Sequence, residues 1–185
     1  MKTGLIRTLL SLLTIALFVT GCDDESGSRL PSVRMDMVVA DVDFDGHVNT
    51  ILVDNGTNLF VKQNRRGPFQ NIQDERIRAI AYYEPLYTSE EAVIYDIAPV
   101  QVIVPVSPNE AGIHQQDPVQ MVRAWPGGGF LNIELSIKTL NLAKHKLTFV
   151  DDSAAMYPGG VFLELFHQGD GDSVTISKNI LVSIP

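Results

Sequence analysis

Short runs of alternating apolar and polar residues, separated by clusters of turn-forming residues, predict an all-β fold. In the clearest run, Leu131–Ile137, every odd position is apolar and every even position is polar, as in a strand with one buried face. Clusters rich in Gly, Pro and Asp separate such runs, for example Pro126–Gly129 and Gly169–Asp172. Short strands with frequent turn signals are typical of sandwiches and barrels.

The first 21 residues have the three parts of a lipoprotein signal peptide. Lys2 and Arg7 give a basic start, and residues 9–19 form an apolar core that is shorter than the roughly 20 residues of a transmembrane helix. The core ends in Val-Thr-Gly-Cys, which resembles the lipobox of lipoproteins and predicts cleavage before Cys22 and lipidation of its thiol. The alternative is an ordinary secretory signal with an incidental cysteine. Residues 22–34 begin with an acidic, polar run that predicts a flexible tether.

Residues 35–106 predict a small OB-type barrel of five strands. Asp45-Gly46 and Asn55-Gly56 are expected hairpin turns. Residues 71–81 fit a short helix as an alternative, because their isoleucines fall loosely on one face. The candidate strands are Met35–Val42, Val48–Val53, Leu59–Lys62, Ile77–Tyr83 and Ala92–Val106.

Residues 107–116 are polar and proline-broken, and they predict a linker. Residues 117–185 then predict an antiparallel β-sandwich. Its strands are expected around residues 131–137, 161–166 and 174–184, where the apolar residues again recur with a period of two.

Composition excludes several function classes. The chain has a formal net charge of −8, which disfavours nucleic acid because binding to phosphates depends on Lys and Arg. Cys22 is the only cysteine, so no disulfide is expected inside the mature protein. No nucleophile elbow is present, and the four histidines lie far apart in sequence, so we expect no enzymatic activity. His145, between two lysines, is expected to be a solvated residue of a polar turn.

Two weak ligand sites are candidates. Asp41, Asp43 and Asp45 match the first positions of a calcium-binding loop, but Leu52 stands where the closing carboxylate belongs. The alternative is a solvated acidic hairpin. No cofactor is expected, apart from calcium if these three aspartates bind it. Tyr82 and Tyr83 are candidates for stacking on a glycan, with the alternative that they fill the barrel and its rim.

Several segments resemble the NigD-like lipoproteins of Gram-negative anaerobes. The resemblance is carried by Asp117–Trp125 followed by Gly129–Glu134, and also by Asp54–Thr57, Arg76–Tyr83 and Val161–Leu165. It implies an N-terminal OB domain and a C-terminal β-sandwich, without implying a catalytic residue. The end after Val174 is shorter than the family pattern, which predicts an open sheet edge.

Together these observations predict a non-enzymatic lipoprotein of the cell envelope. We expect a lipid anchor in a membrane, the outer membrane in preference to the inner one. We also expect an accessory role, of the bacteriocin-immunity type, with an envelope protein or a glycan as the partner. The alternative is a ligand-binding module that uses the OB-like domain to bind glycan or calcium.

Overall fold

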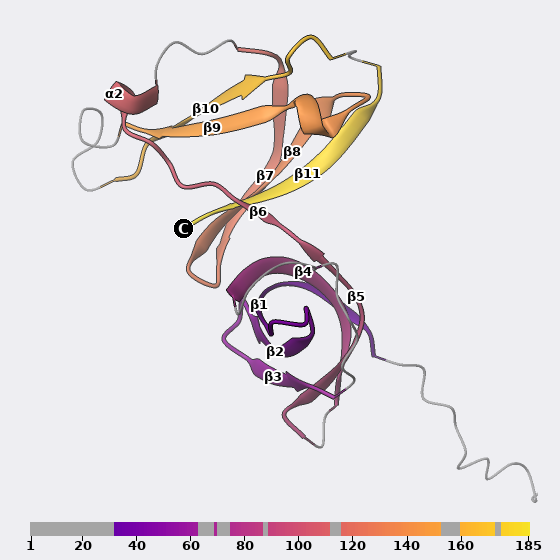
Figure 1. Cartoon of the computed structure of the whole chain (residues 1–185). Helices are drawn as coiled ribbons and strands as arrows, with labels where there is room; N and C mark the ends of the chain where they lie inside the picture. Colours follow the sequence, from indigo (N-terminus) through magenta and orange to yellow (C-terminus); the bar gives the residue numbers. More distant parts are fainter. Residues whose placement is uncertain are drawn as a thin grey trace, which may run out of the picture. The chain divides into compact units, whose positions relative to one another are not determined.

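The computed structural model has the predicted all-β architecture, with a closed barrel followed by a β-sandwich (Figure 1). Residues Ser32–Pro185 form one compact unit. The structure describes residues 32–62, 69, 75–86, 89–111, 116–152, 160–172 and 175–185. The signal peptide, Cys22 and the tether as far as Pro31 lie outside the described residues.

The barrel contains five strands in the order β1-β2-β3-β5-β4, and β4 closes the ring by pairing with β1. Val38 on β1 faces Val53 of β2 on one side and Ala79 of β4 on the other. Alanines and β-branched residues make up most of the interior, and Leu59, Phe69 and Tyr83 complete it. The strands are β1 (Arg34–Val42), β2 (Val48–Val53), β3 (Asn58–Val61), β4 (Glu75–Leu86) and β5 (Glu91–Pro99).

The two predicted hairpin turns are present. Gly46 and Gly56 have φ values of 81° and 91°, a region that a glycine enters without steric cost. The helical alternative for residues 71–81 is wrong over Glu75–Ala81, which belongs to β4. Pairing on both sides with β1 and β5 determines this segment's conformation. Residues 71–74 lie outside the described part of the chain.

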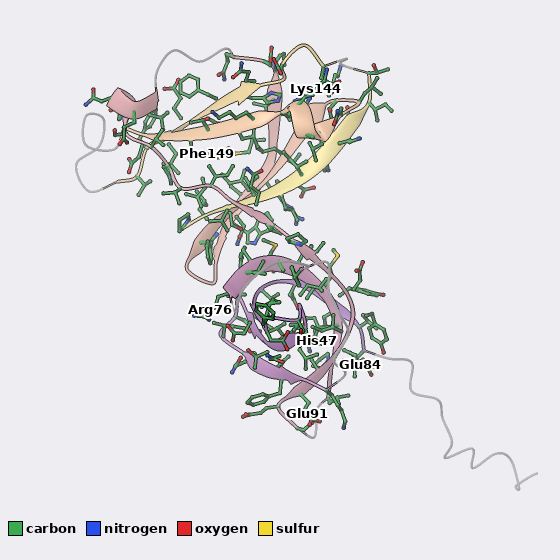
Figure 2. All side chains as sticks on the ribbon, in the orientation of Figure 1. His47, Arg76, Glu84, Glu91, Lys144 and Phe149 are labelled. Atoms are coloured by element: carbon green, nitrogen blue, oxygen red, sulfur yellow. The ribbon has the colours of Figure 1, made fainter. Side chains whose placement is uncertain are left out.

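The second domain packs a four-stranded sheet, ordered β6-β11-β8-β7, against the pair β10-β9. Leu135, Phe149 and Val182 lie in its core, and Figure 2 labels Phe149 on β9. The short elements α2 (Pro108–Ala111) and η1 (Leu142–Lys144) lie in its connections. Its strands are β6 (Gln101–Val102), β7 (Val119–Gly127), β8 (Phe130–Lys138), β9 (Lys146–Asp151), β10 (Leu163–Gln168) and β11 (Ser177–Ile184).

The chain enters the second domain earlier than the predicted linker at 107–116. β5 ends at Pro99, and two residues later Gln101 already pairs with Val182 of β11. Val106 then forms a parallel bridge with Val150 of β9. The alternation of apolar and polar residues continues from residue 92 to residue 106, so the sequence predicts one long strand. Pro99 has no N–H to donate, so the pairing of β5 with β4 ends there.

The C-terminal strand is an internal strand of its sheet. β11 lies between β6 and β8 and pairs with both. The expectation that the shorter C-terminal end leaves an open sheet edge there is therefore wrong. The edges of this four-stranded sheet are instead β6 and β7.

Candidate functional site

The three candidate calcium ligands have other contacts in the barrel. Asp41 accepts a hydrogen bond from Thr50 at 2.5 Å and lies 3.1 Å from the Nε of Arg76. Asp43 accepts the backbone N–H groups of Asp45 and His47 at 3.0 and 2.8 Å. The hydrogen bond from His47 is the main cause that lowers the pKa of Asp43. Among the described residues, no group of three or more acidic, His or Cys side chains is placed to hold a metal ion.

The two candidate stacking tyrosines have different environments. Tyr83 is only 2% exposed, and its hydroxyl donates to Asp36 at 3.0 Å inside the barrel wall. Burial, followed by this hydrogen bond, raises the pKa of Tyr83 to about 12. A ligand cannot stack on a ring so deeply buried, so Tyr83 serves the barrel core.

Tyr82 lies on the outer surface of the barrel and is 48% exposed. Its ring centre is 6.1 Å from that of Tyr95, which is 38% exposed, and Met35 faces it across the β1–β4 pair. We call Met35, Tyr82 and Tyr95 the Tyr82 patch. The Tyr95 hydroxyl donates to Glu84 at 2.8 Å, and Figure 2 labels this acidic neighbour.

A buried polar network that the sequence reasoning missed surrounds Arg78. The guanidinium donates to both oxygens of Asp54, at 2.5 and 2.6 Å, and to Asn132 at 2.8 Å and Ser183 at 3.2 Å. Asn132 donates back to Asp54 at 3.1 Å. The Phe130 ring covers the guanidinium, with 4.6 Å between the guanidinium carbon and the ring centre.

The burial of the Asn132 side chain was not predicted from the sequence. Its even position in the run 131–137 predicted a polar, solvent-facing side chain, but Asn132 has 0% exposure. Burial is tolerated because Asn132 hydrogen-bonds with Arg78, Asp54 and Ser183. The only sequence signal was the presence of Asp54 and Asn132 in the family-like motifs.

A second missed cluster joins His145, His167 and Asp172. The Nδ1 of His145 is 2.7 Å from the Nε2 of His167, and its Nε2 is 3.1 Å from Asp172. The Nδ1 of His167 faces the carbonyl oxygens of Asp117 and Pro118 at 3.3 and 3.2 Å. The expectation that His145 is solvated is therefore wrong, because the side chain is buried among these partners.

Asp172 is fixed by its own hydrogen bonds. It accepts from the Thr139 hydroxyl at 2.6 Å and from the backbone N–H groups of Leu140 and Asn141, both at 2.9 Å. All four ring nitrogens of the histidine pair have partners. The buried rings therefore have the hydrogen-bond partners that their nitrogens require.

This cluster forms one wall of a cavity of about 500 Å³ at the end of the sandwich. The cavity opens between the start of β7, the end of β8 and the start of β11. Its lining comprises Asp117, Pro118, Val119, Gln120, Ser136, Lys138, His145, His167, Gly169, Gly171, Asp172 and Ser177. The volume is in the range typical of small-molecule sites.

A comparison with protein families matches residues 102–185 to the NigD-like C-terminal β-sandwich domain. The chain is NigD-like. The match begins at β6, where the chain enters the second sheet, and it confirms the family indicated by the sequence motifs. None of the curated proteins compared with the chain matches it.

Solved structures resemble both domains of this NigD-like chain. A NigD-like immunity protein from Bacteroides caccae is 27% identical, with a TM-score of 0.70, covering 84% of this chain and 77% of that chain. A protein of unknown function from Bacteroides vulgatus is 22% identical, with a TM-score of 0.61 and coverages of 83% and 75%. A proposed lipoprotein from Bacteroides fragilis is 15% identical, with a TM-score of 0.58 and coverages of 83% and 78%. The last two similarities concern the fold alone.

The described part of this NigD-like chain contains no helix with the length and apolar character needed to cross a membrane. The lipidation site predicted at Cys22 lies outside that part. Membrane attachment through Cys22 stays a prediction from the sequence.

Proposed function

We propose that this NigD-like chain is a non-enzymatic accessory protein of the cell envelope, of the immunity type. In this proposal, lipid on Cys22 holds the chain at the outer membrane, and the Tyr82 patch on the barrel binds a protein partner. The observation that carries the proposal is the exposure of Met35, Tyr82 and Tyr95 beside one another on the barrel surface.

The chemistry of the Tyr82 patch suits a protein interface. Tyrosine is enriched among the residues that dominate binding energy, since it buries a large rigid ring and offers a hydroxyl. Met35 adds an adaptable apolar contact. These three side chains are adjacent, so a partner could cover them together.

Two further observations support the immunity type and the envelope location. The Bacteroides caccae structure, described as a NigD-like immunity protein, resembles this chain over both domains. The lipobox-like residues before Cys22 predict lipidation of its thiol. The lipid would anchor the protein, because lipid chains contribute about 0.8 kcal/mol per buried CH₂. The fold is also that of a proposed lipoprotein from Bacteroides fragilis.

A second candidate function is glycan binding at the same patch. The rings of Tyr82 and Tyr95 are tilted by 56° to each other, and an exposed tyrosine face can stack on a sugar ring. Calcium is less favoured, because the carboxylates of Asp41 and Asp43 already accept hydrogen bonds within the barrel.

The test is photo-crosslinking in cells that produce the full chain. A photoreactive phenylalanine replaces Tyr82, and in the matched control it replaces Val161, which is exposed on the sandwich. We expect one envelope protein to be crosslinked from position 82 and not from position 161. Cells that lack the chain should become sensitive to antibacterial peptides from related strains, and a Tyr82→Ala, Tyr95→Ala double variant should not restore resistance.

The results separate the two candidates. Full protection by the double variant, together with no crosslink at position 82, would contradict the protein-partner proposal. A change in the tyrosine fluorescence of the wild type with oligosaccharides, absent from the double variant, would favour glycan binding instead.

A further inference from the structure

Two carboxylates stand beside the tyrosines of the Tyr82 patch. Asp96 on β5 is paired in register with Tyr82 on β4, so the two side chains lie on the same outward face of the barrel. Glu84 accepts the hydroxyl of Tyr95 at 2.8 Å, and Figure 2 labels Glu84 on the barrel. The patch therefore presents aromatic rings and two carboxylates together.

No cation of the described residues neutralises these two carboxylates. Asp96 and Glu84 each accept a hydrogen bond from a neutral donor, and neither forms an ion pair. Such hydrogen bonds leave the negative charges in place. Arg34, the cation nearest in sequence to Met35 on β1, hydrogen-bonds with Tyr83, whose side chain lies in the barrel core. Arg34 and Met35 point to opposite sides of β1, because successive side chains of a strand alternate. The charge at the patch is therefore negative.

Elsewhere in the chain, an arginine completes this combination of a ring and a carboxylate. Arg123 lies over the Trp125 ring, with 4.7 Å between the guanidinium carbon and the ring centre, and pairs with Glu134 at 2.6 Å. Arg78 lies over Phe130 and pairs with a carboxylate in the same way. A guanidinium suits both places, because its flat face stacks on a ring while its N–H groups bind a carboxylate. Among the described residues, no cation lies over the ring at the centre of the Tyr82 patch.

We propose that the Tyr82 patch binds a basic, arginine-bearing segment of the protein partner. This inference rests on the proposed function, because it takes the patch to be the surface that the partner covers. One arginine of the partner stacks on the exposed Tyr82 ring and pairs with Asp96, and Glu84 attracts a second positive charge. Met35, which faces Tyr82 on β1, contacts the apolar stem of the arginine. The net charge of −8 favours the approach of a basic segment.

The first test compares three acetylated pentapeptides of glycine that carry two arginines, two lysines or two citrullines. Citrulline keeps the planar end group of arginine without its charge. Amide NMR titration of the full chain without its signal peptide measures the binding of each peptide. We expect saturable shifts around Tyr82 and Asp96 with the arginine peptide. The citrulline peptide should bind about tenfold more weakly, and the lysine peptide should have an intermediate affinity, because an ammonium cannot stack as a guanidinium does.

A double variant, Glu84→Gln with Asp96→Asn, tests the carboxylates. Each amide keeps an oxygen that can accept the present hydrogen bond, so the variant removes both charges and preserves the fold. It should bind the arginine peptide about tenfold more weakly than the wild type does. The matched control, Glu110→Gln with Asp170→Asn, removes two exposed carboxylates from the second domain and should leave the affinity unchanged.

Photo-crosslinking from position 35 in cells separates this inference from the proposed function. A photoreactive phenylalanine in place of Met35 leaves Tyr82 and both carboxylates intact. We expect it to crosslink one envelope protein within an arginine-containing segment, and the double carboxylate variant to lose most of this crosslink.

The outcomes distinguish the two failures. If no envelope protein is crosslinked, the proposed function fails, and this inference fails with it. If a protein is crosslinked through a segment without arginine, or equally well in the carboxylate and control variants, this inference is overturned while the proposed function stands. The inference is also overturned if the arginine peptide gives no saturable shift, or if the citrulline or lysine peptide binds as tightly as the arginine peptide.

Discussion

Arg78 and Asp54 form a salt bridge in a place where a single charge would be costly. Asp54→Ala leaves the guanidinium buried without its carboxylate, so we expect a loss of about 3–5 kcal/mol in the free energy of unfolding. Chemical denaturation measures this loss. Arg76→Ala breaks the exposed pair with Asp41 and serves as the control, with an expected loss of no more than about 1 kcal/mol. Equal losses of unfolding free energy in the two variants would show that the Arg78–Asp54 pair stabilises the protein no more than an exposed pair does.

Tyr83 gives the chain a predicted response to alkaline pH. Its pKa is raised from the usual 10.0 of a tyrosine to about 12, mainly by burial. The folded state therefore binds this proton more tightly than the unfolded state. The associated stability is complete below about pH 10 and is lost as the pH rises toward about 12.

Tyr83→Phe tests this response. The variant should lose about 1 kcal/mol at neutral pH, because the hydrogen bond to Asp36 is removed. Its stability should then fall less steeply than that of the wild type between pH 10 and 12. Urea midpoints measured across this range check the prediction, and parallel curves would contradict it.

At the scale of elements, the β7–β8 hairpin approaches the Arg78 network through a glycine. Gly128 has a φ of +61°, and an added Cβ would clash with an oxygen of Asp54. Gly128→Ala should therefore displace the carboxylate from Arg78 as well as strain the backbone. Gly129→Ala, at φ +82° with nothing within 4 Å of its Cβ, should cost only the backbone strain of about 1–2 kcal/mol.

Thermal unfolding of both glycine variants measures the difference. The melting temperature should fall further for Gly128→Ala than for Gly129→Ala. A larger fall for Gly129→Ala would mean that Asp54 can move without destabilising the protein, and that the close approach of the hairpin adds no stability.

The local pattern predicted most of the strands, although it missed β9, and it did not predict which side chains would meet across the fold. β2 was predicted with its observed bounds, because Val48, Ile51 and Val53 mark its buried face and turns enclose it. The histidine pair could not be predicted, since His145 and His167 meet only through the register of β9 and β10. Asn132 was misplaced for the same reason, because its partners Asp54 and Arg78 come from the other domain.

At the scale of the whole molecule, Cys22 predicts that a lipid anchor attaches the protein to a membrane. Cys22→Ala should abolish labelling by a fatty-acid analogue and release the protein from membranes, because the thiol that forms the thioether to lipid is missing. Membrane fractionation with metabolic labelling measures both effects. Retention of the unlabelled variant in the membrane fraction would contradict a lipid anchor.

The parallel pairing of β6 with β11 determines when the second sheet can form during translation. Gln101 leaves the ribosome some 80 residues ahead of Val182, its partner in the sheet, yet β6 has no place in that sheet until β11 arrives between it and β8. The barrel strands, by contrast, are all translated by Pro99. A nascent chain interrupted before β11 would thus carry every strand of the barrel, but its second sheet would lack the strand that joins β6 to β8.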